Sequence, residues 1–348
     1  MTKKTMKNYF IFIPFLILVS CGNPIIEDEY GKVFGLGDNK LYIIKTDADI
    51  SKLHAHPDGT FIFDLDDDIE MDAMLPEFSG KMQGMGPGRV LVSGMMFGET
   101  NGAVIKDMVF LQNSSPDRGV NVVGLVTGVA RNTQFINVRI EGGQIATVRT
   151  GGMEVFVGGI AGQMDAGSVI TRSSSEAGVA AGGGNIINIG GLVGYNNGGV
   201  ISYSYSHGAI TGSAEDTMNA GGLAGLNTGK IFDSYYALAG GIMAAGATTN
   251  NVGGLVGDSS AGIIENSYSS TGAGGNYAGS GLEPASPEKV YHNKTSFVVG
   301  DFSSNPSYWS FDATFQDGDV GGTVTPGSSV TILPRLVNNP DRFSGPWR

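Results

Sequence analysis

Histidines and clustered carboxylates are the residues of this chain whose types could perform chemistry. His54-Ala55-His56 could hold a metal ion between two imidazoles, but Pro57 and Gly59 follow directly and no third ligand lies in evident register. We therefore interpret this segment as an exposed turn. The sequence His-Glu-x-x-His, which a zinc protease needs on one face of a helix, does not occur in the chain.

A run of acidic residues between positions 64 and 72 could bind calcium, because carboxylate oxygens suit that ion. The run lacks the glycine that an EF-hand loop needs at its sixth position. Phe61, Phe63 and Leu65 recur at every second position beside it, which predicts a strand with one solvated face. We therefore predict no metal and no cofactor here. The acidic positions are Asp64, Asp66, Asp67, Asp68, Glu70 and Asp72.

Other patterns of catalysis are incomplete. The segment from Gly225 to Lys230 is one residue short of a phosphate-binding loop, and Ile231 stands where a Ser or Thr would bind magnesium. No Gly-x-Ser-x-Gly nucleophile turn occurs. We predict no catalytic residues.

Composition excludes several functions. The 348 residues carry a net charge of −12 with no basic cluster, which argues against nucleic-acid partners. A single cysteine excludes a disulfide framework and a cysteine-based zinc site. With 41% hydrophobic and only 16% charged residues, the composition predicts a folded chain. Its 56 glycines are an unusually high content.

The first 20 residues have the order of a secretory signal peptide. Lys3, Lys4 and Lys7 precede an apolar run over residues 10–19 that is too short to span a bilayer. The segment 18–21, Leu-Val-Ser-Cys, resembles the bacterial lipobox, and this resemblance implies that Cys21 is lipidated after cleavage. The membrane is then a partner through the lipid anchor.

The residues after Cys21 indicate where in the cell the protein is located. Gly22 is not the aspartate associated with retention in the inner membrane. The acidic group at residues 27–29 resembles the export tether of surface lipoproteins in Bacteroidetes-type bacteria. We therefore expect an outer-membrane lipoprotein exposed on the cell surface, with a periplasm-facing anchor as the alternative.

The glycine content arises largely from an internal repeat. A Gly-Gly-apolar-apolar-Gly pentad returns at steps of 31 or 32 residues, and looser copies begin at Gly94 and Val123. A second signature, such as Ile-Phe-Asp-Ser-Tyr over 231–235, follows each pentad. The four clear pentads occupy residues 158–162, 190–194, 221–225 and 253–257.

Each unit holds β-prone runs of three to five residues, which are too short to bury a face alone. Stacking the units aligns equivalent apolar positions in one interior column. We predict an all-β fold, a right-handed parallel β-helix (β-solenoid), with a six-bladed β-propeller as the alternative. The predicted repeat core is Ile160, Leu192, Leu223 and Leu255, continued by Leu125 and Met96.

Both ends of a solenoid need a cover. Thr46 with Asp49 three residues later predicts a short capping helix, and prolines with Trp309 and Trp347 after about residue 280 predict an irregular C-terminal cap. The expected organisation is a signal peptide (1–20), a tether (21–40), an N-terminal cap with the first coils (41–93), the repeats (94–280) and the C-terminal cap (281–348).

The two linked signatures resemble those of the GLUG-motif repeat family over roughly residues 40–280. Similar repeats occur in adhesin-like bacterial surface proteins, in β-helices of the filamentous-haemagglutinin type, and as accessory repeats in proteases that cut immunoglobulin A. The resemblance implies a β-helical surface protein. It assigns no ligand.

Tyr205, Tyr235 and Tyr268 occupy equivalent positions and are the candidate ligand-binding residues. Pointing outward, they would form a strip for sugar rings or protein surfaces; with a turn at Asp233 and Asn266, they would stack in the interior. We expect adhesin-like binding of glycans or proteins of a host or neighbouring cell. The alternatives are a carbohydrate-active enzyme and a structural protein of the cell envelope.

Overall fold

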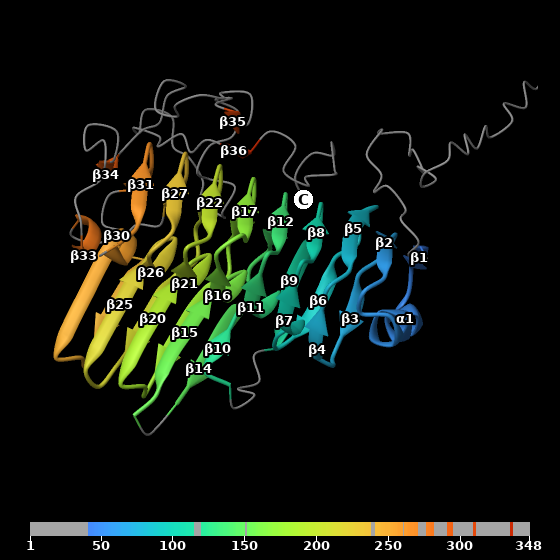
Figure 1. Cartoon of the computed structure of the whole chain (residues 1–348), viewed down its shortest axis with the longest axis horizontal. Coiled ribbons are helices and arrows are strands. Elements are labelled where there is room, and N and C mark those ends of the chain that lie inside the picture. The colour runs from blue at the N-terminus through green and yellow to red at the C-terminus, as the bar shows by residue number, and fades with distance from the viewer. Residues whose placement is uncertain are drawn as a thin grey trace, which may run out of the picture. The chain divides into compact units, whose positions relative to one another are not determined.

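Parallel strands stacked coil upon coil form the described part of the protein, as a computed structural model shows (Figure 1). The structure describes residues 41–114, 120–149, 152–237, 241–259 and 261–270, and the short strands at 276–281, 291–294, 309–310 and 335–336. The predicted parallel β-helix is confirmed, because strands of successive coils pair in parallel where a propeller would form separate blades. Within these residues, no helix has the length and apolar character to cross a membrane.

Sheets I and II each have nine strands, one from each successive turn of the chain. Sheet I consists of β1 (Leu41–Ile44), β2 (Thr60–Asp64), β5 (Lys81–Met85), β8 (Val104–Lys106), β12 (Gln134–Ile136), β17 (Val169–Thr171), β22 (Val200–Ser202), β27 (Lys230–Phe232) and β31 (Ile263–Glu265). Sheet II consists of β3 (Ile69–Met71), β6 (Val90–Ser93), β9 (Val109–Ser114), β13 (Arg139–Ile140), β18 (Ser174–Ser175), β23 (Tyr205–Ser206), β28 (Tyr235–Tyr236), β32 (Tyr268–Ser270) and β34 (Tyr291–Lys294).

Sheet III has two rows, which the 11-residue strand β30 (Thr249–Ser259) joins because it pairs with both. One row is β10 (Val122–Val123), β15 (Glu154–Gly158), β20 (Ile186–Gly190) and β25 (Thr217–Gly221); the other is β4 (Leu75–Phe78), β7 (Phe97–Asn101), β11 (Thr127–Arg131), β16 (Ala161–Asp165), β21 (Val193–Asn197) and β26 (Ala224–Asn227). A further strand, β33 (Asn276–Gly281), pairs with β30.

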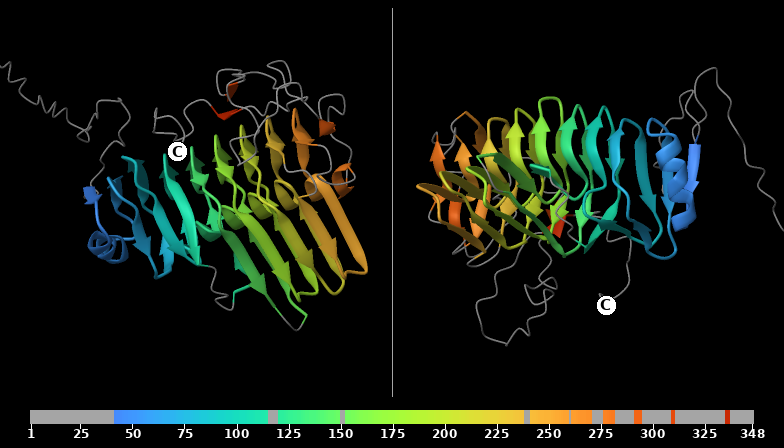
Figure 2. Two further views of the ribbon diagram at one scale, coloured as in Figure 1. Left: turned by 180° about the vertical axis from the view of Figure 1, so that it is seen from behind. Right: turned by 90° about the horizontal axis from the view of Figure 1, so that it is seen from below.

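The coils widen along the chain. Asp68 and Arg89, which hydrogen-bond across the first coils, are 21 positions apart, whereas Val138 and Ser173, bonded across later coils, are 35 apart. The added residues form sheet IV and the first row of sheet III, which lie against each other as a two-layered flange on the side of the stack (Figures 1 and 2). Sheet IV consists of β14 (Gln144–Val148), β19 (Gly178–Gly182), β24 (Ile210–Ser213) and β29 (Ile242–Ala245).

The apolar residues of the pentads form one buried column. The backbone N–H of Leu192 donates to the carbonyl oxygen of Leu223 at 3.0 Å, and that of Leu223 donates to Leu255 at 2.8 Å. Such bonds hold equivalent side chains about 4.8 Å apart, so each covers the next. All of the predicted core positions, Met96, Leu125, Ile160, Leu192, Leu223 and Leu255, have 0% exposure.

The pentad glycines are required by close approach between coils. A Cβ on Gly191 would lie 2.3 Å from the carbonyl oxygen of Gly222 in the next coil and 2.2 Å from Ser206 Oγ. No glycine of the four clear pentads has a positive φ, so close approach and not backbone conformation calls for glycine there.

A short helical segment lies at the N-terminal end of the stack (Figure 1). The 3-10 turn η1 (Asp47–Asp49) leads into α1 (Ile50–Ala55), and Thr46 with Asp49 forms the predicted capping box. Ile50 and Leu53 are buried, so the segment covers the apolar end of the stack. Of the predicted C-terminal cap, the structure describes β34 and the antiparallel pair β35 (Trp309–Ser310) and β36 (Arg335–Leu336); the remainder lies outside the described residues.

Candidate binding surface

The three repeat tyrosines lie inside the coil stack. Tyr205, Tyr235 and Tyr268 are 5%, 0% and 1% exposed, and the rings of Tyr205 and Tyr235 stack with centroids 5.1 Å apart. The outward strip that we considered for these tyrosines is therefore corrected, since rings so deeply buried present no surface to a large ligand.

A reversal of the backbone before each tyrosine turns it inward. Tyr203, Asp233 and Asn266 have φ of 48°, 48° and 45°, so the chain bends two residues ahead of the tyrosine. The left-handed conformation is uncommon outside glycine, and aspartate and asparagine tolerate it best. The turn that we considered at Asp233 and Asn266 is the one present.

The serines between these bends and the tyrosines form a hydrogen-bonded ladder. Ser204 Oγ donates to the carbonyl oxygen of Ser202 at 2.7 Å and accepts from the backbone N–H of Ser173 in the preceding coil at 3.1 Å. The same two bonds recur at Ser234 and Ser267. The ladder satisfies backbone groups that the corner would otherwise leave unpaired in the interior, so the role of this motif is structural.

A second ladder, of asparagines, runs along sheet III. Asn219 Nδ2 donates to Asn188 Oδ1 at 2.7 Å, and Asn251 Nδ2 donates to Asn219 Oδ1 at 2.7 Å. Register places Phe156 at the equivalent position of the preceding coil, so an aromatic ring stands at the head of this ladder.

A strip of outward-facing side chains crosses β7, β11, β16 and β21 and is the best candidate for recognition. On β16 and β21 the half-buried residues alternate with the buried Met164 and Asn196, so they point away from the interior. We call this set the sheet III strip: Glu99, Arg131, Gln163, Asp165, Tyr195 and Asn197, with Phe156 beside it.

Asp165 joins the polar part of the strip. Its Oδ1 accepts from Gln163 Nε2 at 2.7 Å and from Asn197 Nδ2 at 2.9 Å, and its Oδ2 accepts from Arg131 Nε at 3.1 Å. Burial acts to raise the pKa of Asp165, but these hydrogen bonds outweigh it and hold the pKa below its usual range. The carboxylate of Asp165 is therefore ionised at neutral pH. Arg131 also pairs with Glu99, which extends the network along the strip.

Two aromatic rings complete the strip. Tyr195 stacks on Phe156 with ring centroids 5.5 Å apart and an interplanar angle of 23°, and both residues are half-buried. The hydroxyl of Tyr195 donates to Asn197 Oδ1 at 3.0 Å, which ties the rings to the polar network. The strip thus offers a fixed apolar platform beside fixed hydrogen-bonding groups.

The other carboxylates that lie near one another in the described residues are paired with arginine side chains. Arg89 pairs with Asp68 at 2.6 Å and with Glu141 at 3.2 Å, and Arg139 pairs with Glu176 at 3.1 Å. Within the described residues, no group of three or more His, Cys, Asp or Glu is placed to share a metal ion.

The acidic run at 64–72 is divided among local partners. Asp64 pairs with Lys45 at 2.6 Å, and Asp72 accepts from Ser93 Oγ at 3.0 Å. His54 and His56 are exposed, but the expected turn is the C-terminal end of α1, with His54 inside the helix and His56 as its C-cap. The His56 ring stacks on Tyr42, with ring centroids 4.7 Å apart. Cys21, the predicted lipidation site, lies outside the described residues.

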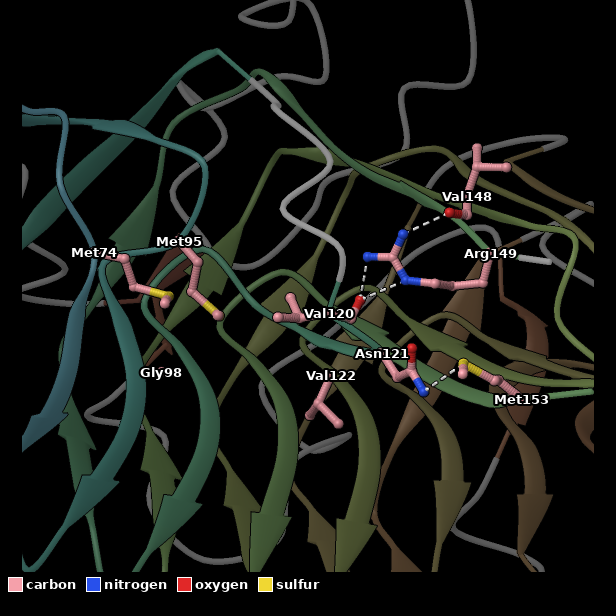
Figure 3. A pocket seen from close by; sticks show the side chains of 9 residues that line it. All are labelled: Met74, Met95, Gly98, Val120, Asn121, Val122, Val148, Arg149 and Met153. Carbon is pink, nitrogen blue, oxygen red and sulfur yellow. Dashed lines mark hydrogen bonds between the residues drawn. The ribbon is translucent and has the colours of Figure 1, made fainter. Parts of the chain in front are cut away.

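A hollow of about 650 Å³ marks the step where the flange begins (Figure 3). Methionines 74, 95 and 153 line it together with the segment 120–122 and Arg149. The guanidinium of Arg149 is held by the carbonyl oxygens of Val120 and Val148, at distances of 2.5 to 3.0 Å, so it fastens the two segments together. Asn121 Nδ2 donates to Met153 Sδ at 3.2 Å, so both polar side chains of the hollow have local partners.

No family model matches the chain, and no curated protein matches it. Among solved structures, the chain is similar to the crystal structure of a "putative immunoglobulin A1 protease from Bacteroides ovatus", with 16% sequence identity and a TM-score of 0.45 over 83% of this chain and 96% of that chain.

Proposed function

We propose that this chain is a lipid-anchored protein of the outer cell surface and that its β-helix acts by adhesin-like binding of glycans or proteins on a host or neighbouring cell. The sheet III strip carries the proposal, because it holds aromatic and polar groups facing outward in one fixed network. Such a surface suits recognition through many modest contacts.

The repeat sequence supports the same proposal. The linked pentad and Ile-Phe-Asp-Ser-Tyr signatures resemble the GLUG-motif family, and we propose membership of that family, whose β-helices occur in adhesin-like surface proteins. In a stack of this kind each coil contacts its neighbours alone, so a rigid face can be displayed without a large globular core.

The anchor is tested separately from the binding. Intact cells that express the full chain are treated with a protease that cannot enter them, and the chain is followed by immunoblotting. Degradation in intact cells, together with loss of membrane association in a Cys21→Ala variant, is expected. Protection until the outer membrane is opened would contradict surface exposure and favour a periplasm-facing structural protein.

Binding is tested by adhesion of the same cells to surfaces coated with host-cell glycans and extracellular-matrix proteins. We expect adhesion above that of cells without the chain and a loss of that excess in a Tyr195→Ala variant. Phe232→Ala is the matched control, because Phe232 is also a half-buried aromatic but belongs to sheet I. Equal adhesion with and without the chain would refute the proposal.

A further inference from the structure

We infer that the sheet III strip is a glycan-binding site and that its ligand is an uncharged oligosaccharide. This inference rests on the proposed function and narrows it to one chemical class of partner. Three features of the strip carry it: the ring pair, the unused hydrogen-bonding groups and the balance of charge.

The ring pair provides the apolar half of a sugar site. One face of a pyranose carries several C–H groups, which are slightly positive, and the face of an aromatic ring is negative, so the two pack together. Tyr195 and Phe156 are held parallel within 23° and remain partly exposed. Because the two rings stack, each covers one face of the other, and the outer face of the pair suits one sugar unit better than the broad apolar core of a protein interface.

The polar half consists of groups whose hydrogen-bonding capacity is only partly used by the described residues. Gln163 donates to Asp165 and leaves its carbonyl oxygen available, and Asn197 uses one of its two N–H groups in the same way. Arg131 leaves Nη2 available beside Asp165 Oδ2. Adjacent donors and acceptors of this kind suit the neighbouring hydroxyl groups of a sugar.

The network holds these groups in place before any ligand arrives. Asp165 receives three side-chain donors, and Asn197 is fixed at both ends by Asp165 and Tyr195. Side chains that are already ordered lose little conformational entropy on binding. The strip therefore has the preorganisation that recognition of a flexible, well-hydrated sugar requires.

Charge disfavours an anionic ligand. The strip contains two carboxylates, Glu99 and Asp165, against the single guanidinium of Arg131, and both carboxylates already pair with it. The whole chain carries a net charge of −12. Sialylated or sulfated glycans would therefore be repelled both by the strip and by the chain, whereas neutral hydroxyl groups meet no such penalty.

The length of the strip sets the size of the ligand. Leu226 on β26 is in register with Tyr195 and bounds the strip on one side with an aliphatic group, and Val129 on β11 lies within the strip between Glu99 and Gln163. Arg131 and Asn197 belong to coils two steps apart, which corresponds to roughly 10 Å at the usual strand spacing. We therefore expect a stretch of two or three sugar units to be contacted.

The test uses the full chain purified in detergent and an array that carries neutral and charged versions of the same glycans. The probes are N-acetyllactosamine oligomers, mannan and cellohexaose, with sialylated N-acetyllactosamine and heparin as the charged set. Binding to at least one neutral probe is expected, with no binding to the charged set. The Tyr195→Ala substitution should raise the dissociation constant, measured by calorimetry, at least tenfold.

Two further variants keep the outcome interpretable. Tyr195→Phe retains the ring and loses the bond to Asn197, so we expect about a two- to fivefold loss, and Phe232→Ala should bind as the wild type does. Circular dichroism melting checks that each variant is folded. Binding confined to charged glycans, binding unaffected by Tyr195→Ala, or no glycan binding would overturn the inference. Adhesion to matrix proteins that survived such a result would leave the proposed function standing.

Discussion

Asn219 Nδ2 donates a hydrogen bond of 2.7 Å to Asn188 Oδ1, one coil earlier in the stack. Both residues are at most 5% exposed, and Asn219 in turn accepts from Asn251. The side-chain amides therefore continue, within the protein, the pairing that the backbone makes between strands.

Replacing Asn219 with alanine should destabilise the β-helix. The change leaves Asn188 Oδ1 without a donor and removes the acceptor of Asn251, and an unpaired buried polar group costs about 1–3 kcal/mol. Urea unfolding followed by circular dichroism measures the loss. Asn250→Ala is the control, because Asn250 is exposed and bonds only locally to Ala247, so its midpoint should stay close to that of the wild type.

Ser234→Ala tests the serine ladder. Ser234 Oγ accepts from the buried backbone N–H of Ser204 at 3.1 Å, and alanine leaves that donor unpaired at a cost of about 1–3 kcal/mol. The urea midpoint should fall, and hydrogen exchange at the Ser204 amide should accelerate. The exposed Ser213→Ala serves for comparison, and equal midpoints for the two variants would show that the ladder contributes nothing.

A pair of glycine substitutions separates close approach from simple flexibility. Gly191→Ala places a Cβ against the carbonyl oxygen of Gly222 and should cost about 1–3 kcal/mol through overpacking. A Cβ on Gly182 would lie within 4 Å of no other atom, and Gly182 does not have a positive φ. Because alanine reduces the conformational freedom of the unfolded chain, Gly182→Ala should leave the free energy of unfolding unchanged or raise it by up to about 1 kcal/mol. Thermal melting of both variants decides between these causes; similar losses would exclude contact between coils as the reason.

The pair of Asp68 and Arg89 should contribute stability that depends on pH. The hydrogen-bonded guanidinium of Arg89 lowers the pKa of Asp68, so the contribution is complete above the carboxyl's unfolded value of about 4 and is lost as pH falls through the lower folded value. Because both side chains are about a third exposed, we expect at most about 1 kcal/mol at pH 7.

The measurement for this pair compares urea midpoints of the wild type and Asp68→Asn at pH 7 and pH 2. The difference at pH 7 should shrink toward pH 2, because the Asp68 carboxyl takes up a proton as the pH falls through its lowered pKa. A difference that persists at pH 2 would show that the loss arises from packing and not from the ion pair.

The coil stack could be predicted from the regular spacing of the pentads alone. Successive pentads place Leu192 and Leu223 one coil apart, and a series of such short apolar segments can be buried only by stacking. The capping helix was predictable for a similar reason, since Thr46 and Asp49 satisfy each other within one turn.

The direction of the tyrosines could not be settled in advance. A single residue in the left-handed conformation, such as Asp233, reverses the alternation of side chains, and its residue type permits that conformation without demanding it. The sequence pattern thus left Tyr235 with two orientations.

The sheet III strip escaped the sequence analysis because it does not repeat. Gln163, Tyr195 and Leu226 occupy equivalent positions in successive coils and share no chemistry. A search for recurring motifs ignores such positions. An available signal was the alternation of polar and apolar residues within β16 and β21, which marks their outward positions without a repeat.

The widening of the coils has an evolutionary consequence. Because sheets I and II run unchanged past the point where the flange begins, a gene could gain or lose segments at one corner of a coil while the rest of the register is preserved. Duplication of a complete unit would likewise insert between two neighbours that already match it. Descendants of this gene can therefore vary the reach and the side surfaces of the protein independently of its hydrophobic spine.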